Sequence, residues 1–344
     1  MSRKIIQTSF AVCITRFLTG YLPGERNFSP QTIKSYSQAL KMYIMYLNST
    51  EKIKPERIDF KDITANSVKE FLKSMELSEN IGPSTFNQRL SALKAFIRYA
   101  MLEHPEFLEN GQRILAIPSK RSPKPEIIYL EKDAMRALLK IPDQTSIQGR
   151  RELAIMAMLY DTGARVQELI DLKIKDVRLE NPETVTLNGK RRKIRTVPIM
   201  AETAKVLVSY LRDRGLVEQS AFGDLYLFSS TNRSQFTRPG IAKILKRNFA
   251  TAKKANPTLI FPKDIYPHAI RASKAIHLLE SGVNIIAIRD FLGHVSVSTT
   301  QIYLQVNDKI KRDAIARAYP QLMETVPEWK NDSDLLALLK ELCS

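Results

Sequence analysis

The stretch HAIRASKAIHLLESGVNIIAIRDFLGHVSVSTTQIYL, residues 268–304, holds three of the four histidines of this chain. Its apolar residues recur at helical spacing, which predicts three consecutive helices, over about 267–280, 284–291 and 297–304. His268 and Arg271 are three residues apart, so they project from one face of the first helix. His294 follows a glycine at a helix end, and Tyr303 lies nine residues later. This part of the chain therefore combines a helical fold with a concentration of reactive side chains.

The net charge indicates a polyanionic partner. The 344 residues suit two domains of common size. Lys and Arg number 53 against 36 Asp and Glu, which gives a formal net charge of +17, spread along the chain. DNA or RNA is the leading partner, because basic side chains that neutralise phosphates release counterions. A basic surface that serves only solubility is the alternative.

Cysteine use and hydropathy predict a cytoplasmic protein. Cys13 and Cys343 lie near opposite ends of the chain and form no disulfide or metal-binding spacing. Polar residues interrupt the apolar run at the start, so it does not read as a signal sequence. No segment has the roughly 18 uninterrupted apolar residues of a membrane span.

Residues 1–112 read as a small helical domain. Four helical patterns occur there, over about 6–20 and beginning near Pro30, Thr64 and Ser84. Ser29 and Pro30 supply an N-cap and a first-turn proline. The segment PSKRSPKP at 118–125 has three prolines and three basic residues without a large apolar side chain, so it is expected to be extended. We therefore expect an interdomain linker over 113–126. It reads either as a plain basic loop or as a strap along a phosphate backbone, with Lys120, Arg121 and Lys124 as candidate DNA contacts.

The second domain combines helices with one hairpin. Helices are predicted over about 131–140, 150–161, 201–213 and 238–251. Gly163 is suited to a left-handed helix end, which places Arg165 at or just before the next helix start. In ETVTLNGKRRKIRTVPIM, residues 183–200, apolar residues flank a polar break that contains a glycine, which predicts a β-hairpin with Lys190 at its tip. The apolar residues expected to alternate along its strands are Val185, Leu187, Ile194, Val197 and Ile199.

Together the polar residues suit phosphate chemistry. They comprise two guanidiniums, an ammonium, two imidazoles and a phenol, contributed by Arg165, Arg271, Lys190, His268, His294 and Tyr303. No carboxylate pair accompanies them, so no metal site is expected. Arginine offers a planar fork of donors that matches phosphate oxygens. Taken singly, each residue is ordinary, since Tyr303 is one of 12 tyrosines, and we assign His277 to structure. The occurrence of all six residues together supports the prediction of a phosphate site.

These motifs resemble the tyrosine recombinases, also called phage-type integrases. DTGARVQELIDLKIKDV resembles the first arginine box, with Arg165 and the supporting Glu168, and NGKRRKIRTVPI resembles the hairpin that carries the catalytic lysine. HAIRASKAIHLLESG resembles the His-x-x-Arg box, and LGHVSVSTTQIYLQV resembles the last box with its nucleophilic tyrosine. Two positions depart from the pattern: Arg191 stands where glycine is common, and Ala272 where histidine or arginine is common.

The resemblance implies a mainly α, two-domain fold. A SAM-like core-binding domain over 1–112 would precede an α+β catalytic domain over 127–320 with a small antiparallel sheet. A tail helix over 321–344, rich in leucine, would dock on a neighbouring protomer, or alternatively on its own domain. The implied reaction needs no cofactor and no metal. Tyr303 would attack a DNA phosphate, Arg165, Arg271 and His294 would hold its oxygens, His268 would exchange a proton with Tyr303, and Lys190 would protonate the leaving oxygen.

The implied partners are duplex DNA with a specific site, a homo-tetramer on two such sites, and possible accessory DNA-bending proteins or a partner recombinase. The chain length favours integration and excision of a mobile element. Chromosome-dimer resolution of the Xer type is the first alternative. A type IB topoisomerase and a DNA-binding accessory protein without turnover are the others.

Overall fold

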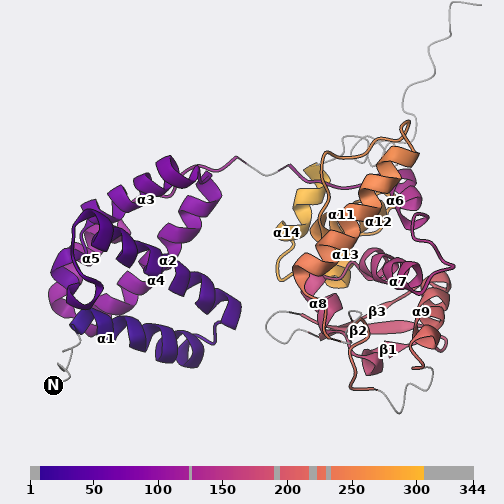
Figure 1. Ribbon diagram of the computed structural model, residues 1–344, viewed down its shortest axis with the longest axis horizontal. Helices are drawn as coiled ribbons and strands as arrows, with labels where there is room; N and C mark the ends of the chain where they lie inside the picture. Colours follow the sequence, from indigo (N-terminus) through magenta and orange to yellow (C-terminus); the bar gives the residue numbers. More distant parts are fainter. Residues whose placement is uncertain (1–7, 124–125, 190–193, 217–222, 230–233, 306–344) are drawn as a thin grey trace, which may run out of the picture. The chain divides into compact units, whose positions relative to one another are not determined.

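The computed structural model describes residues 8–123, 126–189, 194–216, 223–229 and 234–305. The chain divides into two compact units, Met1–Pro125 and Glu126–Ser344 (Figure 1). The division falls within the expected linker. The fold is mainly α with one small antiparallel sheet, as the sequence predicts.

The first unit is entirely helical in its described part. Its α-helices are α1 (Ser9–Arg16), α2 (Pro30–Thr50), α3 (Ala65–Glu79), α4 (Pro83–Glu103) and α5 (Leu108–Leu115). A π-helical segment, Phe17–Glu25, continues α1, and short 3-10 turns occupy Pro55–Arg57, Phe60–Asp62 and Pro105–Phe107. Ser29 caps α2 and Thr64 caps α3 through side-chain oxygens that accept backbone N–H groups. The predicted helix starts at Pro30 and Thr64 are thus confirmed.

Helix α5 was not predicted, and it runs past the expected domain edge at residue 112. Gly111 in its middle disfavours a helix in isolation. In the fold, a Cβ at this position would lie 2.5 Å from Cγ of Met101 on α4. The glycine therefore lets α5 lie close against α4, and this packing outweighs its weak helix propensity.

The second unit surrounds a buried central helix, α7. Its α-helices are α6 (Lys132–Leu139), α7 (Ile147–Thr162), α8 (Val166–Asp171), α9 (Ala201–Asp213), α11 (Arg238–Ala255), α12 (Pro267–Glu280), α13 (Ile285–Leu292) and α14 (Ser298–Gln301). Short 3-10 turns occupy Ile174–Asp176 and Ile302–Gln305. Helix α7 contacts α6, α8, α9 and α12, and most of its residues are buried (Figure 1). Gly163 ends it with φ +57°, as expected.

The sheet has three antiparallel strands in the order β1 (Val177–Arg178), β2 (Thr184–Asn188) and β3 (Ile194–Pro198). Val185 pairs with Val197 and Leu187 with Arg195. Ile194, which was expected to alternate with the other apolar residues of the hairpin, does not share their buried face, because it is 64% exposed. Side chains alternate along a strand, so Val197 shares its face with Arg195 and not with Ile194. The hairpin therefore turns an arginine toward the interior.

His277 joins the start of the second unit to its core, in agreement with its assignment to structure. One ring nitrogen, Nδ1, lies 2.9 Å from the Tyr160 hydroxyl, and Nε2 lies 2.9 Å from the carbonyl oxygen of Leu130. The backbone N–H of Leu130 also donates to the Ser273 hydroxyl. The two bonds of Leu130, to His277 and to Ser273, anchor the segment before α6 to α12.

Gly163 ends α7 two residues before Arg165, and its substitution tests the packing at this position. An added Cβ would lie 2.8 Å from Cδ2 of Leu292, whereas Gly215, with φ +67°, has no atom within 4 Å of the added Cβ. We expect Gly215→Ala to lower the free energy of unfolding by about 1–2 kcal/mol through backbone strain. Gly163→Ala should lower the free energy of unfolding by about 1–3 kcal/mol more, because its Cβ would overlap the Leu292 side chain. Calorimetry of the full chain measures both, and equal losses would contradict the packing argument.

Candidate active site

Five of the six predicted catalytic residues lie in the described part of the second unit. Arg165 is the N-cap of α8, His268 and Arg271 lie on α12, His294 follows α13, and Tyr303 lies in the turn after α14. Lys190 lies outside the described residues.

The C-terminal end of α13 accepts one hydrogen bond from each of three arginines. Arg195 Nε donates to the carbonyl oxygen of Phe291 at 2.9 Å, and Arg271 Nη2 donates to that of Leu292 at 2.6 Å. Arg165 Nη2 lies 3.4 Å from the carbonyl oxygen of Gly293. The last carbonyls of a helix lack partners within the helix and carry its negative dipole end, which favours cations. Three consecutive carbonyls thereby gather guanidiniums from β3, α12 and the start of α8.

Glu168 is the acidic partner of this cluster. It accepts from Arg195 Nη2 at 2.7 Å, from Arg195 Nη1 at 3.2 Å and from Arg165 Nη1 at 2.6 Å, and also from the Arg165 backbone N–H. Its side chain is 4% exposed and that of Arg195 is 8% exposed. Burial alone would raise the pKa of Glu168, but hydrogen bonds from Arg195 and Arg165 outweigh it and hold the pKa below its ordinary value. Glu168 is therefore ionised at neutral pH.

Arg271 is fully enclosed, with 1% of its surface exposed. Besides Leu292, its guanidinium donates to the carbonyl oxygen of Gly163 at 2.6 Å, while its Nε finds no hydrogen-bond partner among the described residues. Burial, followed by the neighbouring charge of Arg165, lowers the pKa of Arg271 to about 9. The guanidinium thus stays positively charged at neutral pH, held by backbone carbonyls with an unused donor.

The two predicted histidines are neutral near pH 7. Burial and then the charges of Arg271 and Arg165 lower the pKa of His294 to about 3. His268 is exposed at the surface, yet partial shielding and the same two arginines also lower its pKa. His294 is 5% exposed, and its Nδ1 lies 2.8 Å from the hydroxyl oxygen of Thr300. A neutral imidazole offers one donor and one acceptor, so either ring can take part in proton transfer or in a hydrogen bond.

Tyr303 is buried beside His294. Its ring lies parallel to that of His294 with centroids 6.4 Å apart, and the side chain is 1% exposed. It packs in an apolar cluster formed with α12 and α13, whose other buried members are Ala272, Ala275, Ile276, Leu279, Ile288 and Leu292. Burial raises the pKa of Tyr303, although Arg271 and Arg165 oppose this rise. The phenol is therefore protonated at neutral pH. Helix α14, which precedes Tyr303, begins after Val297 without a side-chain cap.

Two of the three linker residues predicted to contact DNA, Lys120 and Arg121, lie in the described part of the first unit. The Lys120 ammonium pairs with Glu76 and lies 4.6 Å from the centroid of the Phe86 ring, and its backbone bonds to the Asn87 side chain. Arg121 is exposed. Lys124 lies outside the described residues.

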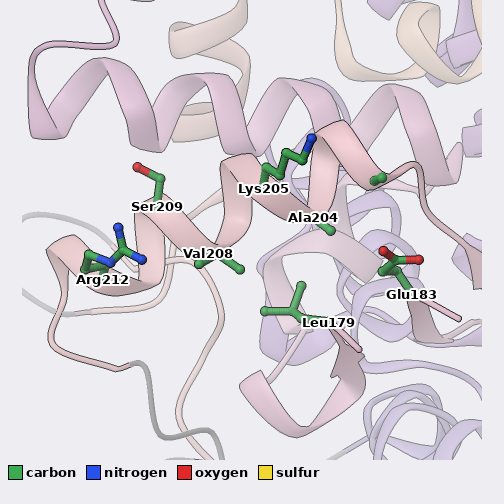
Figure 2. A pocket seen from close by; sticks show the side chains of 8 residues that line it. Leu179, Glu183, Ala204, Lys205, Val208, Ser209 and Arg212 are labelled. Carbon is green, nitrogen blue, oxygen red and sulfur yellow. The ribbon is translucent and has the colours of Figure 1, made fainter. Parts of the chain in front are cut away.

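A surface pocket of about 310 Å³ lies elsewhere on the second unit (Figure 2). It is lined by Leu179, Glu183, Ala201, Ala204, Lys205, Val208, Ser209 and Arg212. None of the predicted catalytic residues lines it. Within the described ranges, no three His, Cys, Asp or Glu residues are grouped as a metal would require. No described helix is both long and apolar enough to cross a membrane.

Comparison with known proteins decides the family. Residues 129–309 match the model of the phage integrase family, and residues 14–104 match the SAM-like N-terminal domain of phage integrases. The chain belongs to the phage integrase family. It is a tyrosine site-specific recombinase that binds DNA, in line with the resemblance in its motifs.

Several relatives of this recombinase match it over most of their length. It is 32% identical to the putative integrase/recombinase y4rC of Sinorhizobium fredii, over 97% of this chain and 98% of that protein. It is 30% identical to tyrosine recombinase XerC of Oceanobacillus iheyensis, over 88% and 94% respectively. Among solved structures, the Tn1549 transposon integrase in complex with transposon right end DNA shares the fold with a TM-score of 0.65 at 16% identity, covering 89% of this chain and 98% of that one.

The recombinase site contains one residue that the sequence analysis missed, Arg195. It bonds both to Glu168 and to the end of α13, so it links β3 to the arginine cluster. The hairpin sequence carries several basic residues, and the motifs single out Lys190 rather than Arg195. Because side chains alternate along a strand, the inward position of Val197 indicates that Arg195 also faces inward.

Replacing Glu168 tests the buried ion pairs of the recombinase. We expect Glu168→Gln to lower the free energy of unfolding at pH 7 by about 3–5 kcal/mol, because Arg195 would keep a buried charge without its acidic partner. The pKa of Glu168 is lower in the fold than its ordinary value of 4.5. Its contribution is therefore present above about pH 4.5 and is lost as pH falls through the lower folded pKa.

Urea unfolding from pH 7 down to pH 3 measures this contribution. The stability of the native chain should fall more steeply on acidification than that of Glu168→Gln. Asp224→Asn is the matched control, because that carboxylate is 79% exposed although it pairs with Lys173 and Lys175, and we expect little change from it. Parallel pH profiles for the native chain and Glu168→Gln would count against the role of Glu168.

Proposed function

We propose that this recombinase cuts and rejoins duplex DNA through a 3′-phosphotyrosyl intermediate, with Tyr303 as the nucleophile. The observation that carries the proposal is the convergence of Arg165, Arg271, His294 and Tyr303 around the end of α13. Guanidiniums held in place before substrate binds stabilise the charge that grows on a phosphate in the transition state.

The chemistry assigns a role to each residue. The Tyr303 oxygen forms a bond to phosphorus while the bond from phosphorus to the 5′ oxygen breaks. The tyrosine proton passes to His268, whose lowered pKa leaves it neutral and able to accept. Arg165, Arg271 and His294 bind the nonbridging oxygens, and Lys190 protonates the leaving 5′ oxygen. The 5′-hydroxyl of a second strand then reverses the step, so the bond energy is kept, and the reaction needs neither ATP nor a metal.

We also propose a natural role in the integration and excision of a mobile element. The match to a putative integrase/recombinase extends along 97% of the chain, whereas the match to the XerC relative covers 88%. The fold of a transposon integrase bound to its transposon end supports the same role. Resolution of chromosome dimers is the second candidate, favoured by the several relatives named XerC or XerD at 29–30% identity.

For assembly, we propose a homo-tetramer on two DNA sites, joined by the tail at 321–344. That tail lies outside the described residues. Its support is the sequence pattern, in which five leucines recur at helical spacing between 335 and 342. The linker residues Lys120, Arg121 and Lys124 would contact the DNA backbone, and accessory DNA-bending proteins or a second recombinase would join the complex.

A nicked suicide duplex that carries the cognate site tests the reaction. The native chain should form a covalent protein–DNA adduct without added metal, and Tyr303→Phe should form none, because the attacking oxygen is gone. Tyr210→Phe is the matched control, since Tyr210 is equally buried, with 1% exposed, and should keep the adduct. Denaturing gel electrophoresis reads the result. An adduct that survives Tyr303→Phe would overturn the assignment.

The role of the arginine fork is tested by Arg165→Lys. Lysine keeps the charge but loses the bidentate geometry, so we expect adduct formation to slow by roughly 100- to 1000-fold. DNA affinity should change little, because most phosphate contacts lie elsewhere. Arg289→Lys is the control, an arginine on α13 whose side chain bonds to no residue but the neighbouring Asp290 in the part of the chain that the structure describes. Single-turnover kinetics and a filter-binding assay measure the two quantities, and an unchanged rate would remove Arg165 from the reaction.

A further inference from the structure

Thr300 is the sole hydrogen-bond partner of the His294 ring within the described residues. Its side chain is 0% exposed, and its hydroxyl oxygen lies 2.8 Å from Nδ1 of His294. No other side-chain hydrogen bond involves either group in the described ranges. The threonine lies on α14, six residues after the histidine and three before Tyr303.

The direction of this hydrogen bond follows from burial. If His294 carried its proton on Nδ1 and donated it, the Thr300 hydroxyl proton would remain in a closed site without an acceptor. If the hydroxyl donates to Nδ1 instead, its proton and the Nδ1 lone pair are both satisfied, and Nε2 is not among the buried side-chain atoms of the described residues that lack a partner. An unmet buried donor is costly, whereas the two neutral forms of an imidazole differ little in themselves. The second arrangement is therefore the stable one.

Donation by Thr300 places the imidazole proton on Nε2. Burial of the ring, followed by the positive charges of Arg271 and Arg165, opposes a second proton on it. A neutral ring with an N–H at Nε2 can still donate to an anion. The ring also lies parallel to Tyr303, 6.4 Å between centroids, so the donor belongs to the same cluster as the nucleophile.

We propose that Thr300 is a positioning residue that holds His294 in the form protonated at Nε2, so that the ring donates a hydrogen bond to a nonbridging oxygen of the DNA phosphate. This inference rests on the proposed function for its catalytic consequence. The state of the ring in the free protein does not depend on that function. Thr300 itself does not touch the substrate.

The state of the ring is measured directly by nitrogen NMR. The full chain is labelled with ¹⁵N-histidine at neutral pH, and its four histidines are distinguished by substituting each in turn with glutamine. We expect His294 to show a protonated Nε2 and an unprotonated Nδ1, and Thr300→Val to show a mixture of the two forms. A protonated Nδ1 in the native chain would overturn the proposal, whether or not the variant folds.

Kinetics on the suicide duplex gives the second readout. Thr300→Val should slow adduct formation by roughly 10- to 100-fold, the range typical of a metal-binding histidine that loses the partner orienting its ring. Thr300→Ser, which keeps the hydroxyl, should recover most of this loss. Thr299→Val is the matched control, because Thr299 is the exposed neighbour on the same helix, and its rate should equal that of the native chain. DNA affinity should be the same in all four proteins.

The two possible failures are distinguishable. If the native chain forms no adduct, the proposed function fails, while the NMR result still decides the role of Thr300. If the native chain forms the adduct and Thr300→Val matches its rate with an unchanged ring signal, the positioning role fails alone. A loss of rate in Thr300→Val that serine does not recover, with a native-like ring signal, would also count against it, since packing would then explain the loss.

Discussion

The C-terminal end of helix α13 holds three arginine side chains in place through hydrogen bonds. The last carbonyls of α13 receive Arg195, Arg271 and Arg165, and Glu168 neutralises part of the charge that they bring together. Without such partners, three guanidiniums would repel one another and expel at least one to solvent. The backbone of α13 and one buried carboxylate thus make a positively charged site stable before DNA arrives. The rest of the second unit brings these segments together.

The positions of histidine and tyrosine follow from the same helix end. Gly293 turns the chain out of α13 with φ +65°, and a side chain there would lie 2.9 Å from the guanidinium of Arg195. His294 follows this turn, and next come α14 and a 3-10 turn, which place Thr300 and Tyr303 beside the histidine ring. Nucleophile, phosphate ligands and their supports therefore share one short length of backbone.

Helical periodicity and capping residues located α2, α3, α7 and α12 from the sequence, because each has an apolar face and a clear start or end signal. The family motifs located Arg165, Arg271, His294 and Tyr303. Two features of the structure were not predicted from the sequence. Helix α5 depends on close contact at Gly111, which is a tertiary property. Arg195 was not singled out in the sequence, because its burial depends on acidic and carbonyl partners supplied by distant segments. Lys190 and the tail at 321–344 stay predictions.

Because the arginines bond to main-chain oxygens of α13, the side chains of Phe291 and Leu292 do not enter these bonds. Substitution within the last turn of α13 therefore leaves the arginine acceptors in place wherever packing is kept. A single inserted or deleted residue between 284 and 293 is different, because it rotates the helix end by about 100° and presents other carbonyls. The number of residues in α13, more than their identity, therefore decides which carbonyl oxygens face the arginines.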